Sequence, residues 1–168
     1  FCANATSTDR NDNTAIGYLA LQVNTGIGNT AVGVYSADSN TTATGITAIG
    51  NRALCSNTTG ANNTAMGMCS LLANTTGANN VAVGVLALDS NTTGAGNVVV
   101  GKSAGSAITT GSDNVLVGIN AGDGITTGAR NMLFGTNTEA SAVDGTDQSA
   151  IGNSVTGKGN DTFTTGGA

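Results

Sequence analysis

The chain has 168 residues, a length that suits one domain, but its composition is not that of an ordinary globular protein. Only 9% of the residues are charged, 26 are glycine, and proline, tryptophan and histidine are absent. Aromatic residues, whose side chains bury the most area, make up only 3%. We therefore expect a thin core that is filled by small aliphatic side chains.

The net charge of −5 is spread thinly along the chain, so a nucleic-acid partner is not indicated. No apolar run approaches the roughly 20 residues of a membrane span, so we expect no membrane insertion in this segment. Apolar residues make up 39% of the chain and recur regularly, which argues against disorder.

One glycine recurs along almost the whole chain and defines a repeat. Its spacing is 17 residues, with a single spacing of 16. This column consists of Gly17, Gly33, Gly50, Gly67, Gly84, Gly101, Gly118, Gly135 and Gly152. In chain order, we expect a partial coil over residues 1–12, the repeats over 13–152, and a partial coil or a join to a stalk over 153–168. The start at Phe1, inside an unfinished repeat, suggests a fragment of something longer.

Each repeat combines one short strand with several turns. The residues that lead into the column glycine are rich in β-branched side chains, as in 81–84 and 98–101, and favour a strand. Asn, Gly, Thr and Ser fill most of the remainder, and no helical period extends across a unit. The pattern predicts an all-β fold, a parallel β-solenoid of about nine to ten 17-residue coils, each hydrogen-bonded to the next.

We number positions relative to the column glycine, so that −1 precedes it and +1 follows it. Position −1 is apolar in every coil, and we assign it to the core: Ile16, Val32, Ile49, Met66, Val83, Val100, Val117, Phe134 and Ile151. Alternation along a strand then turns position −2 outward. That column is also wholly apolar, which predicts a subunit interface: Ala15, Ala31, Ala48, Ala65, Ala82, Val99, Leu116, Leu133 and Ala150. The opposite assignment, with −2 inward, also leaves one apolar face for a homo-oligomer to cover.

Polar columns accompany the apolar ones. We expect an asparagine ladder just before the strand to satisfy turn backbone groups: Asn63, Asn80, Asn97, Asn114 and Asn131. A threonine column precedes a turn glycine at Thr59, Thr76, Thr93, Thr110 and Thr127. Asn-x-Thr sequons, which are possible glycosylation sites, begin at Asn40, Asn57, Asn74 and Asn91, and also at Asn4 and Asn160. Turn-forming asparagine explains them without glycans and is the preferred interpretation. Cys2, Cys55 and Cys69 show no metal-binding spacing, and we expect small semi-buried thiols, with a Cys55–Cys69 or interchain bridge as the alternative.

Nothing in the sequence indicates a reaction centre. A chain without histidine lacks the usual base for a serine or cysteine nucleophile. The acidic residues fall at scattered positions in the repeat, and no phosphate-binding or calcium-binding loop motif is present. We therefore expect no enzymatic activity, no cofactor and no metal site.

The repeat element resembles a known family. The pattern of residues 13–17 (NTAIG) followed by Ala20 and Leu21, and of residues 80–84 (NVAVG) followed by Ala87 and Leu88, is similar to the head repeats of YadA-like trimeric autotransporter adhesins. It is equally similar to repeats of phage and large-virus fibre proteins. The resemblance covers residues 13–152 and implies a left-handed β-roll, three chains side by side, and attachment at a cell or virion surface. The unit here is longer than that of the adhesin heads.

The sequence therefore favours an extracellular structural or adhesive fibre segment that forms a homotrimer and binds an unknown surface receptor. Two alternatives remain. The rods are subunits of a self-assembling extracellular filament, or the threonine column is an ice-binding surface. The ice-binding alternative is the weaker one, because Thr58 and Thr59 are adjacent in the chain and should point to opposite faces.

Overall fold

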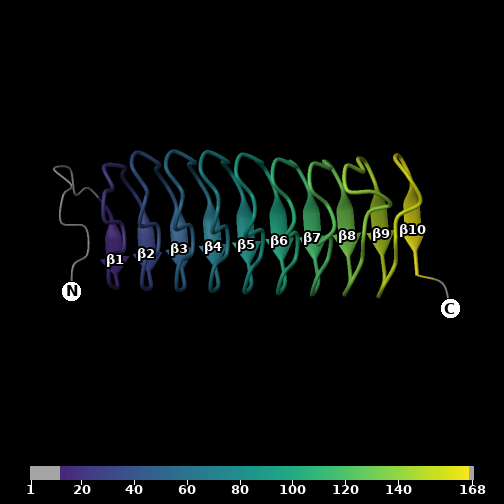
Figure 1. Ribbon diagram of the computed structural model, residues 1–168, viewed down its shortest axis with the longest axis horizontal. Helices are drawn as coiled ribbons and strands as arrows, with labels where there is room; N and C mark the ends of the chain where they lie inside the picture. The colour runs from purple at the N-terminus through teal and green to yellow at the C-terminus, as the bar shows by residue number, and fades with distance from the viewer. Residues whose placement is uncertain (1–11, 167–168) are drawn as a thin grey trace.

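The computed structural model describes residues 12–166, which form a rod of stacked coils (Figure 1). Each coil contributes one strand of three residues to a single parallel sheet, and the strands follow one another in sequence order. The ten strands are β1 (Thr14–Ile16), β2 (Thr30–Val32), β3 (Thr47–Ile49), β4 (Thr64–Met66), β5 (Val81–Val83), β6 (Val98–Val100), β7 (Val115–Val117), β8 (Met132–Phe134), β9 (Ser149–Ile151) and β10 (Phe163–Thr165). The prediction of an all-β parallel solenoid with 17-residue coils, here about nine turns, is confirmed.

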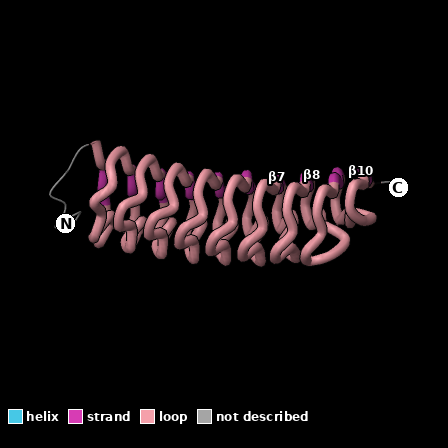
Figure 2. Tube along the Cα trace, turned by 90° about the horizontal axis from the view of Figure 1, so that it is seen from above, coloured by secondary structure: helices cyan, strands magenta, loops and turns pink. Residues whose placement is uncertain are grey.

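The register of the sheet follows the repeat. Equivalent residues pair across every interface between neighbouring strands, for example Ala65 with Ala82 and Ala82 with Val99. The strands line one side of the rod and the loops form the others (Figure 2). We name each coil after the strand with which it begins, so that coil 5 begins with β5. Ten strands about 4.8 Å apart give a rod roughly 45 Å long.

The assignment of the two apolar columns to inside and outside was wrong and must be reversed. Position −2 points inward: eight of its nine members are fully buried, and Ala15, in the first described coil, is half-buried. The predicted interface of Ala15, Ala31, Ala48, Ala65, Ala82, Val99, Leu116, Leu133 and Ala150 is therefore the core of the solenoid. The predicted core column of Ile16, Val32, Ile49, Met66, Val83, Val100, Val117, Phe134 and Ile151 points outward and is exposed or half-buried. Because both columns are apolar throughout, hydropathy alone did not distinguish them.

Side-chain volume is exchanged between positions within the core. In coil 5, position −2 is Ala82, position +4 is Leu88, and position +7 is Asn91, all fully buried. In coil 7 the same positions hold Leu116, Gly122 and Ile125. A Cβ atom added at Gly122 would lie only 2.9 Å from Leu116 Cδ1 and 3.2 Å from Ile125 Cδ1. The branched side chains at −2 and +7 therefore occupy the space that leucine at +4 fills in the earlier coils.

Two buried asparagine ladders run through the interior, one at position −4 and one at +7. At −4, the Oδ1 atom of Asn80 accepts the backbone N–H of Asn97 at 3.0 Å, and the Asn97 amide donates to the Gly111 carbonyl at 2.9 Å. Equivalent contacts join Asn114 and Asn131. Side-chain amides thus satisfy turn backbone groups in coil after coil, which confirms the predicted ladder.

The last coil is shorter than the others. The spacing from Gly152 to Gly166, which follows β10 in register, is 14 residues. The segment 153–168, predicted as a partial coil or a join, therefore completes a tenth strand within its described part. Most of the predicted partial coil over residues 1–12 lies outside the described residues. Along residues 12–166, no helix is long and apolar enough to cross a membrane.

Candidate functional site

The outward face of the sheet is an extended apolar surface that the repeat creates. Strand residues at −3 and −1 point out on either side of the buried −2 residue. Met66 at −1 is 41% exposed and Val100 is 38% exposed. Position −3 is threonine in β1 to β4 and valine or methionine in β5 to β8, so this face becomes more apolar along the chain. We call the outward residues of β1 to β9 the strand face.

Residues that follow the column glycine add to this apolar surface, as expected for positions +1 and +2. The exposed members are Tyr18, Val34, Tyr35, Met68, Val85 and Ile119, while Leu19 and Leu86 are half-buried. Tyr18 and Tyr35 pack edge to face across neighbouring coils, with ring centroids 5.6 Å apart. Lys102 and Arg52 are the basic residues at these two positions within the described coils.

A second regular surface lies at the turn that precedes the strands. Its inner column, at position +8, is threonine in seven consecutive coils: Thr25, Thr41, Thr58, Thr75, Thr92, Thr109 and Thr126. Each hydroxyl donates to the backbone carbonyl of the equivalent residue in the next coil; the contact from Thr58 to Thr75 is 2.9 Å long. These bonds fix the threonine side chains along the stack. Sequence reasoning considered Thr58 but did not recognise that it belongs to a column.

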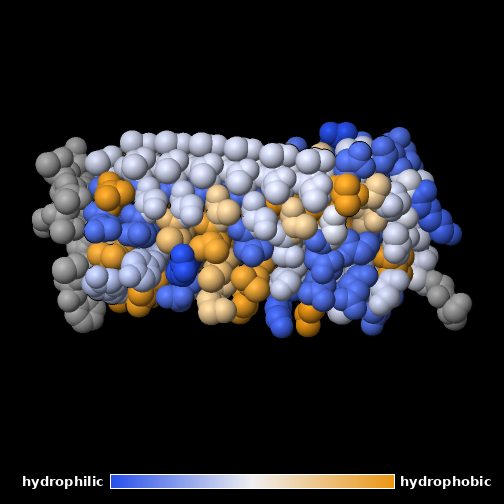
Figure 3. Space-filling view, in the orientation of Figure 1, coloured by the Kyte–Doolittle hydropathy of each residue, from blue (hydrophilic) through white to orange (hydrophobic). Residues whose placement is uncertain are grey.

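The neighbouring column at +9 is exposed and contains the predicted threonines: Thr59, Thr76, Thr93, Thr110 and Thr127, with Thr42 before them. We call the two columns the threonine ridge. A pale band of residues with near-neutral hydropathy runs along the upper edge of the space-filling view, and apolar residues gather below it (Figure 3). The ridge is uncharged from coil 2 to coil 7 and ends where Asp144 replaces threonine.

The four candidate glycosylation sites are not available in the folded chain. Asn40, Asn57, Asn74 and Asn91 form the +7 ladder and are fully buried. The Asn74 amide donates to Asn57 Oδ1 at 2.7 Å and to the Gly77 carbonyl at 2.9 Å. A glycan on this nitrogen would remove those hydrogen bonds and has no space within the core. The structure thus agrees with the turn-forming role, because each of these asparagines satisfies a turn carbonyl inside the stack.

Cys55 and Cys69 are half-buried free thiols, in agreement with the first of the two expectations, and Cys2 lies outside the described residues. Burial is the main cause that raises the pKa of the Cys55 thiol, and the nearby Asp38 carboxylate raises it further. A raised pKa keeps the thiol protonated, which makes it a poor nucleophile. Within residues 12–166, no three side chains of His, Cys, Asp or Glu come together as a metal site.

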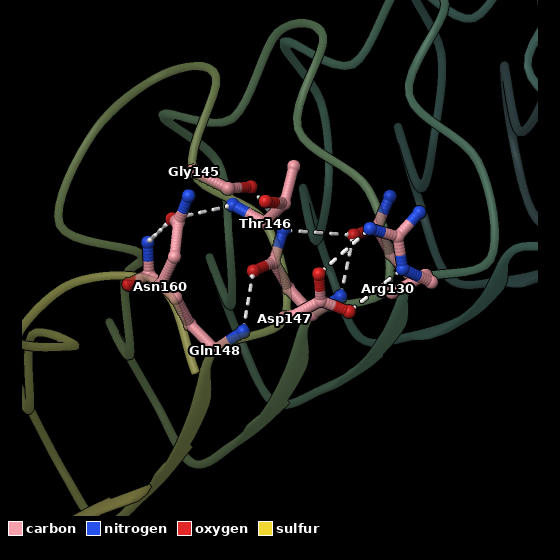
Figure 4. A network of polar contacts seen from close by, with 8 residues as sticks. Arg130, Gly145, Thr146, Asp147, Gln148 and Asn160 are labelled. Carbon is pink, nitrogen blue, oxygen red and sulfur yellow. Dashed lines mark hydrogen bonds and ion pairs between the residues drawn. The ribbon is translucent and has the colours of Figure 1, made fainter. Parts of the chain in front are cut away.

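Charged and amide side chains fasten the last coils to one another (Figure 4). Arg130 donates two hydrogen bonds of 2.7 Å to the carboxylate of Asp147, which lowers the pKa of that exposed carboxyl. Gln148 replaces the column asparagine, and its longer side chain reaches the Ser141 hydroxyl at 3.0 Å. Asn160 accepts the N–H of Thr146 at 3.0 Å. These groups hold the loops of coils 7, 8 and 9 together.

The geometry thus provides two extended surfaces, the strand face and the threonine ridge. Comparison of the chain with protein-family models, with curated proteins and with solved structures finds no match. The function is therefore argued from these two surfaces and from the repeat that generates them.

Proposed function

We propose that the chain is a segment of an extracellular structural or adhesive fibre, in which three copies pack side by side through their strand faces and attach to a cell or virion surface. The observation that carries this proposal is the outward column at −1, which is apolar in nine successive coils. An apolar surface of this length normally marks a site of association.

The size of the strand face suits a second copy of the same chain. Its columns are about 7 Å apart and the stack is roughly 45 Å long, so the face with its +1 flank covers on the order of 700 Å². This is close to the area that one partner contributes to a stable protein interface. Identical rods carry identical faces, and closed rotational symmetry covers all of them.

The gradient along the strand face favours a parallel arrangement of the copies. A parallel pair places the threonine-rich half, β1 to β4, against its own equivalent and the valine-rich half against its own. An antiparallel pair would set threonine hydroxyls against valine and methionine side chains. The left-handed trimer and the attachment role rest on the resemblance of the repeat to trimeric adhesin heads and viral fibres.

Two charged substitutions on the strand face are expected to separate the copies. The wild-type chain should sediment as a trimer, and Met66→Glu/Val100→Glu should sediment as a monomer with an unchanged circular dichroism spectrum, because both side chains are already turned outward. Thr59→Glu/Thr93→Glu adds the same charge to the exposed ridge and should remain trimeric. Sedimentation equilibrium and native mass spectrometry measure both variants.

The attachment role is tested on the same material. Because linked copies raise the effective concentration, the monomeric variant should bind a receptor-bearing surface at least about 100-fold more weakly than the trimer. A wild-type chain that stays monomeric at tens of micromolar would remove the assembly part of the proposal. Fibres in electron micrographs, in place of separate rods, would favour the filament alternative.

A second candidate function, ice binding, is favoured by the threonine ridge. Its hydroxyl and methyl groups repeat about every 4.8 Å along the rod, close to a repeat of the oxygen lattice of ice. The hydroxyls of the inner column are held by backbone carbonyls, so little conformational freedom is lost on binding. No charged side chain interrupts the ridge from coil 2 to coil 7.

The same two variants test this second function. If the ridge binds ice, the wild-type chain shows thermal hysteresis at millimolar concentration and Thr59→Glu/Thr93→Glu does not, since charge disrupts the ordered water layer. Met66→Glu/Val100→Glu should retain the hysteresis. A wild-type chain without measurable hysteresis eliminates ice binding and leaves the fibre proposal untouched.

A further inference from the structure

Glu139 has an unusual position in the solenoid. It is the single glutamate of the chain and stands at position +4, which holds leucine or glycine in most coils. Its backbone pairs with the next coil: the Glu139 N–H donates to the Val155 carbonyl and the Gly157 N–H donates to the Glu139 carbonyl, both at 2.8 Å. Its side chain runs the other way, back to coil 7.

The Glu139 carboxyl replaces part of a backbone contact between coils. In regular coils the N–H at +6 donates to the carbonyl at +5 of the next coil, as from Ala73 to Asp89 at 2.9 Å. In coil 7 the residue at +6 is Gly124, and its N–H donates to Glu139 Oε2 at 3.2 Å. The preceding N–H, of Asp123, donates to Glu139 Oε1 at 3.1 Å. A side chain therefore joins the two coils at this edge.

The surroundings of the Glu139 carboxyl favour its protonated form. Asp123 and Glu139 line the same hollow, and the Asp123 N–H already holds the Glu139 carboxyl beside its own residue, so two ionised carboxylates here repel each other. Burial is the main cause that raises the pKa of Glu139 to about 8, and the hydrogen bond to Asp123 adds to the rise. The other residues that line the hollow here carry no charge: Gly124, Ala140, Ser141, Ala142, Val143 and Thr156. Asp123 is thus the titratable group that faces Glu139.

We propose that Glu139 and Asp123 form a protonation-dependent clasp, which joins coil 8 to coil 7 at this edge and opens when both carboxyls are ionised. The protonated Glu139 shares its proton with the Asp123 carboxyl while its oxygens accept the two backbone N–H groups. Once Glu139 loses that proton, repulsion drives the two loops apart and water solvates both carboxylates. The sheet between β7 and β8 stays paired, so only the edge opens.

The direction of the pH dependence follows because Glu139 binds its proton more tightly in the folded chain than in the unfolded chain. Because the pKa of Glu139 is higher in the folded chain than in the unfolded one, the stability from the clasp is complete below about pH 4.5 and is lost as the pH rises through about 8. The switch thus operates on the alkaline side of neutrality.

A single labelled residue tests the clasp directly. In the wild-type chain with ¹³Cδ-labelled glutamate, one carboxyl resonance should titrate near pH 8. Over the same range, the hydrogen-exchange protection factors of the Asp123 and Gly124 amides should fall about tenfold or more, while that of the Ala73 amide stays constant. Asp123→Asn should move the midpoint toward the ordinary glutamate range, since an asparagine amide favours the ionised Glu139.

Two further variants complete the design. Glu139→Gln keeps a carbonyl oxygen for one N–H and an amide that donates to Asp123, so the protection should become independent of pH. Asp144→Asn alters an exposed acid of the same loop and should leave the midpoint unchanged. A glutamate midpoint near 4.5 in the wild-type chain, or protection at Asp123 and Gly124 that does not change with pH, overturns the clasp.

Discussion

Replacing Gly84 with alanine is expected to destabilise the rod by more than about 4 kcal/mol, the largest effect of any single substitution considered. Gly84 has a φ of +141°, a backbone region that is essentially closed to side-chain-bearing residues. An added Cβ atom would also overlap the carbonyl group of Gly101 in the next coil, at 2.6 Å from its carbon. The neighbouring coil must move away, which breaks the stack at its middle.

A second glycine supplies the control. Gly28 has a φ of +68°, and a Cβ atom added there meets no atom within 4 Å. Equivalent positions in other coils carry Asn62 or Asp113 at similar angles. Gly28→Ala should therefore cost only about 1–2 kcal/mol. Urea denaturation followed by circular dichroism measures both variants. Equal midpoints for Gly28→Ala and Gly84→Ala would show that close contact between coils is not the reason why glycine recurs at this position.

The second large effect is expected from Leu88→Gly in the core. Removing a fully buried leucine side chain costs about 2–5 kcal/mol through lost contacts and the cavity left behind. Leu88 has a φ of +53°, so glycine relieves about 1 kcal/mol of backbone strain. The net loss should be about 1–4 kcal/mol, measured as a shift in the unfolding midpoint.

The chain itself indicates how to repair that loss. Ala82→Leu/Leu88→Gly/Asn91→Ile gives coil 5 the core of coil 7, and most of the lost stability should return. The Oδ1 atom of Asn91 is buried without a hydrogen-bond partner because the ladder ends there. In Asn91→Ile the ladder ends at Asn74, whose Oδ1 atom then loses its donor. The number of asparagine oxygens without a hydrogen-bond partner therefore stays the same. A triple variant no more stable than Leu88→Gly alone would contradict the exchange of volume within the core.

The period and the strands were predictable because they depend on local signals that repeat many times. A glycine every 17 residues, preceded by β-branched side chains, defines the register wherever the chain turns back on itself. The buried asparagines before the strands followed from the same periodicity. These features need no knowledge of which side of the strand is covered.

The orientation of the strands was decided wrongly, although the sequence holds a signal for it. Position −2 grows from Ala82 to Leu116 where position +4 shrinks from Leu88 to Gly122. When the side chains of one column become larger as those of another become smaller, the two columns must share one packed interior. The side-chain volume of an outward column does not depend on that of an inward column. The column at −1 stays large throughout and shows no such exchange.

Other features of the surfaces depend on single departures from the repeat and left no periodic trace. Glu139 counted only as one more scattered acid, because its importance comes from a loop of coil 8 that lacks a regular backbone contact. The column of +8 threonines was not recognised because their hydroxyl bonds to the next coil are visible only in three dimensions. The burial of Asn57 was missed for the same reason, because sequence spacing does not tell which way a side chain points.

The parallel stacking of the coils determines how a fibre built from this segment responds to tension. The hydrogen bonds between neighbouring strands run parallel to the rod axis. A pull on the two ends therefore breaks the bonds between one pair of coils at a time, instead of those between all coils together. Each coil that peels away frees 17 residues, which extend to roughly 55 Å. A short rod of this design would therefore lengthen many times over, one coil at a time, before it is fully drawn out.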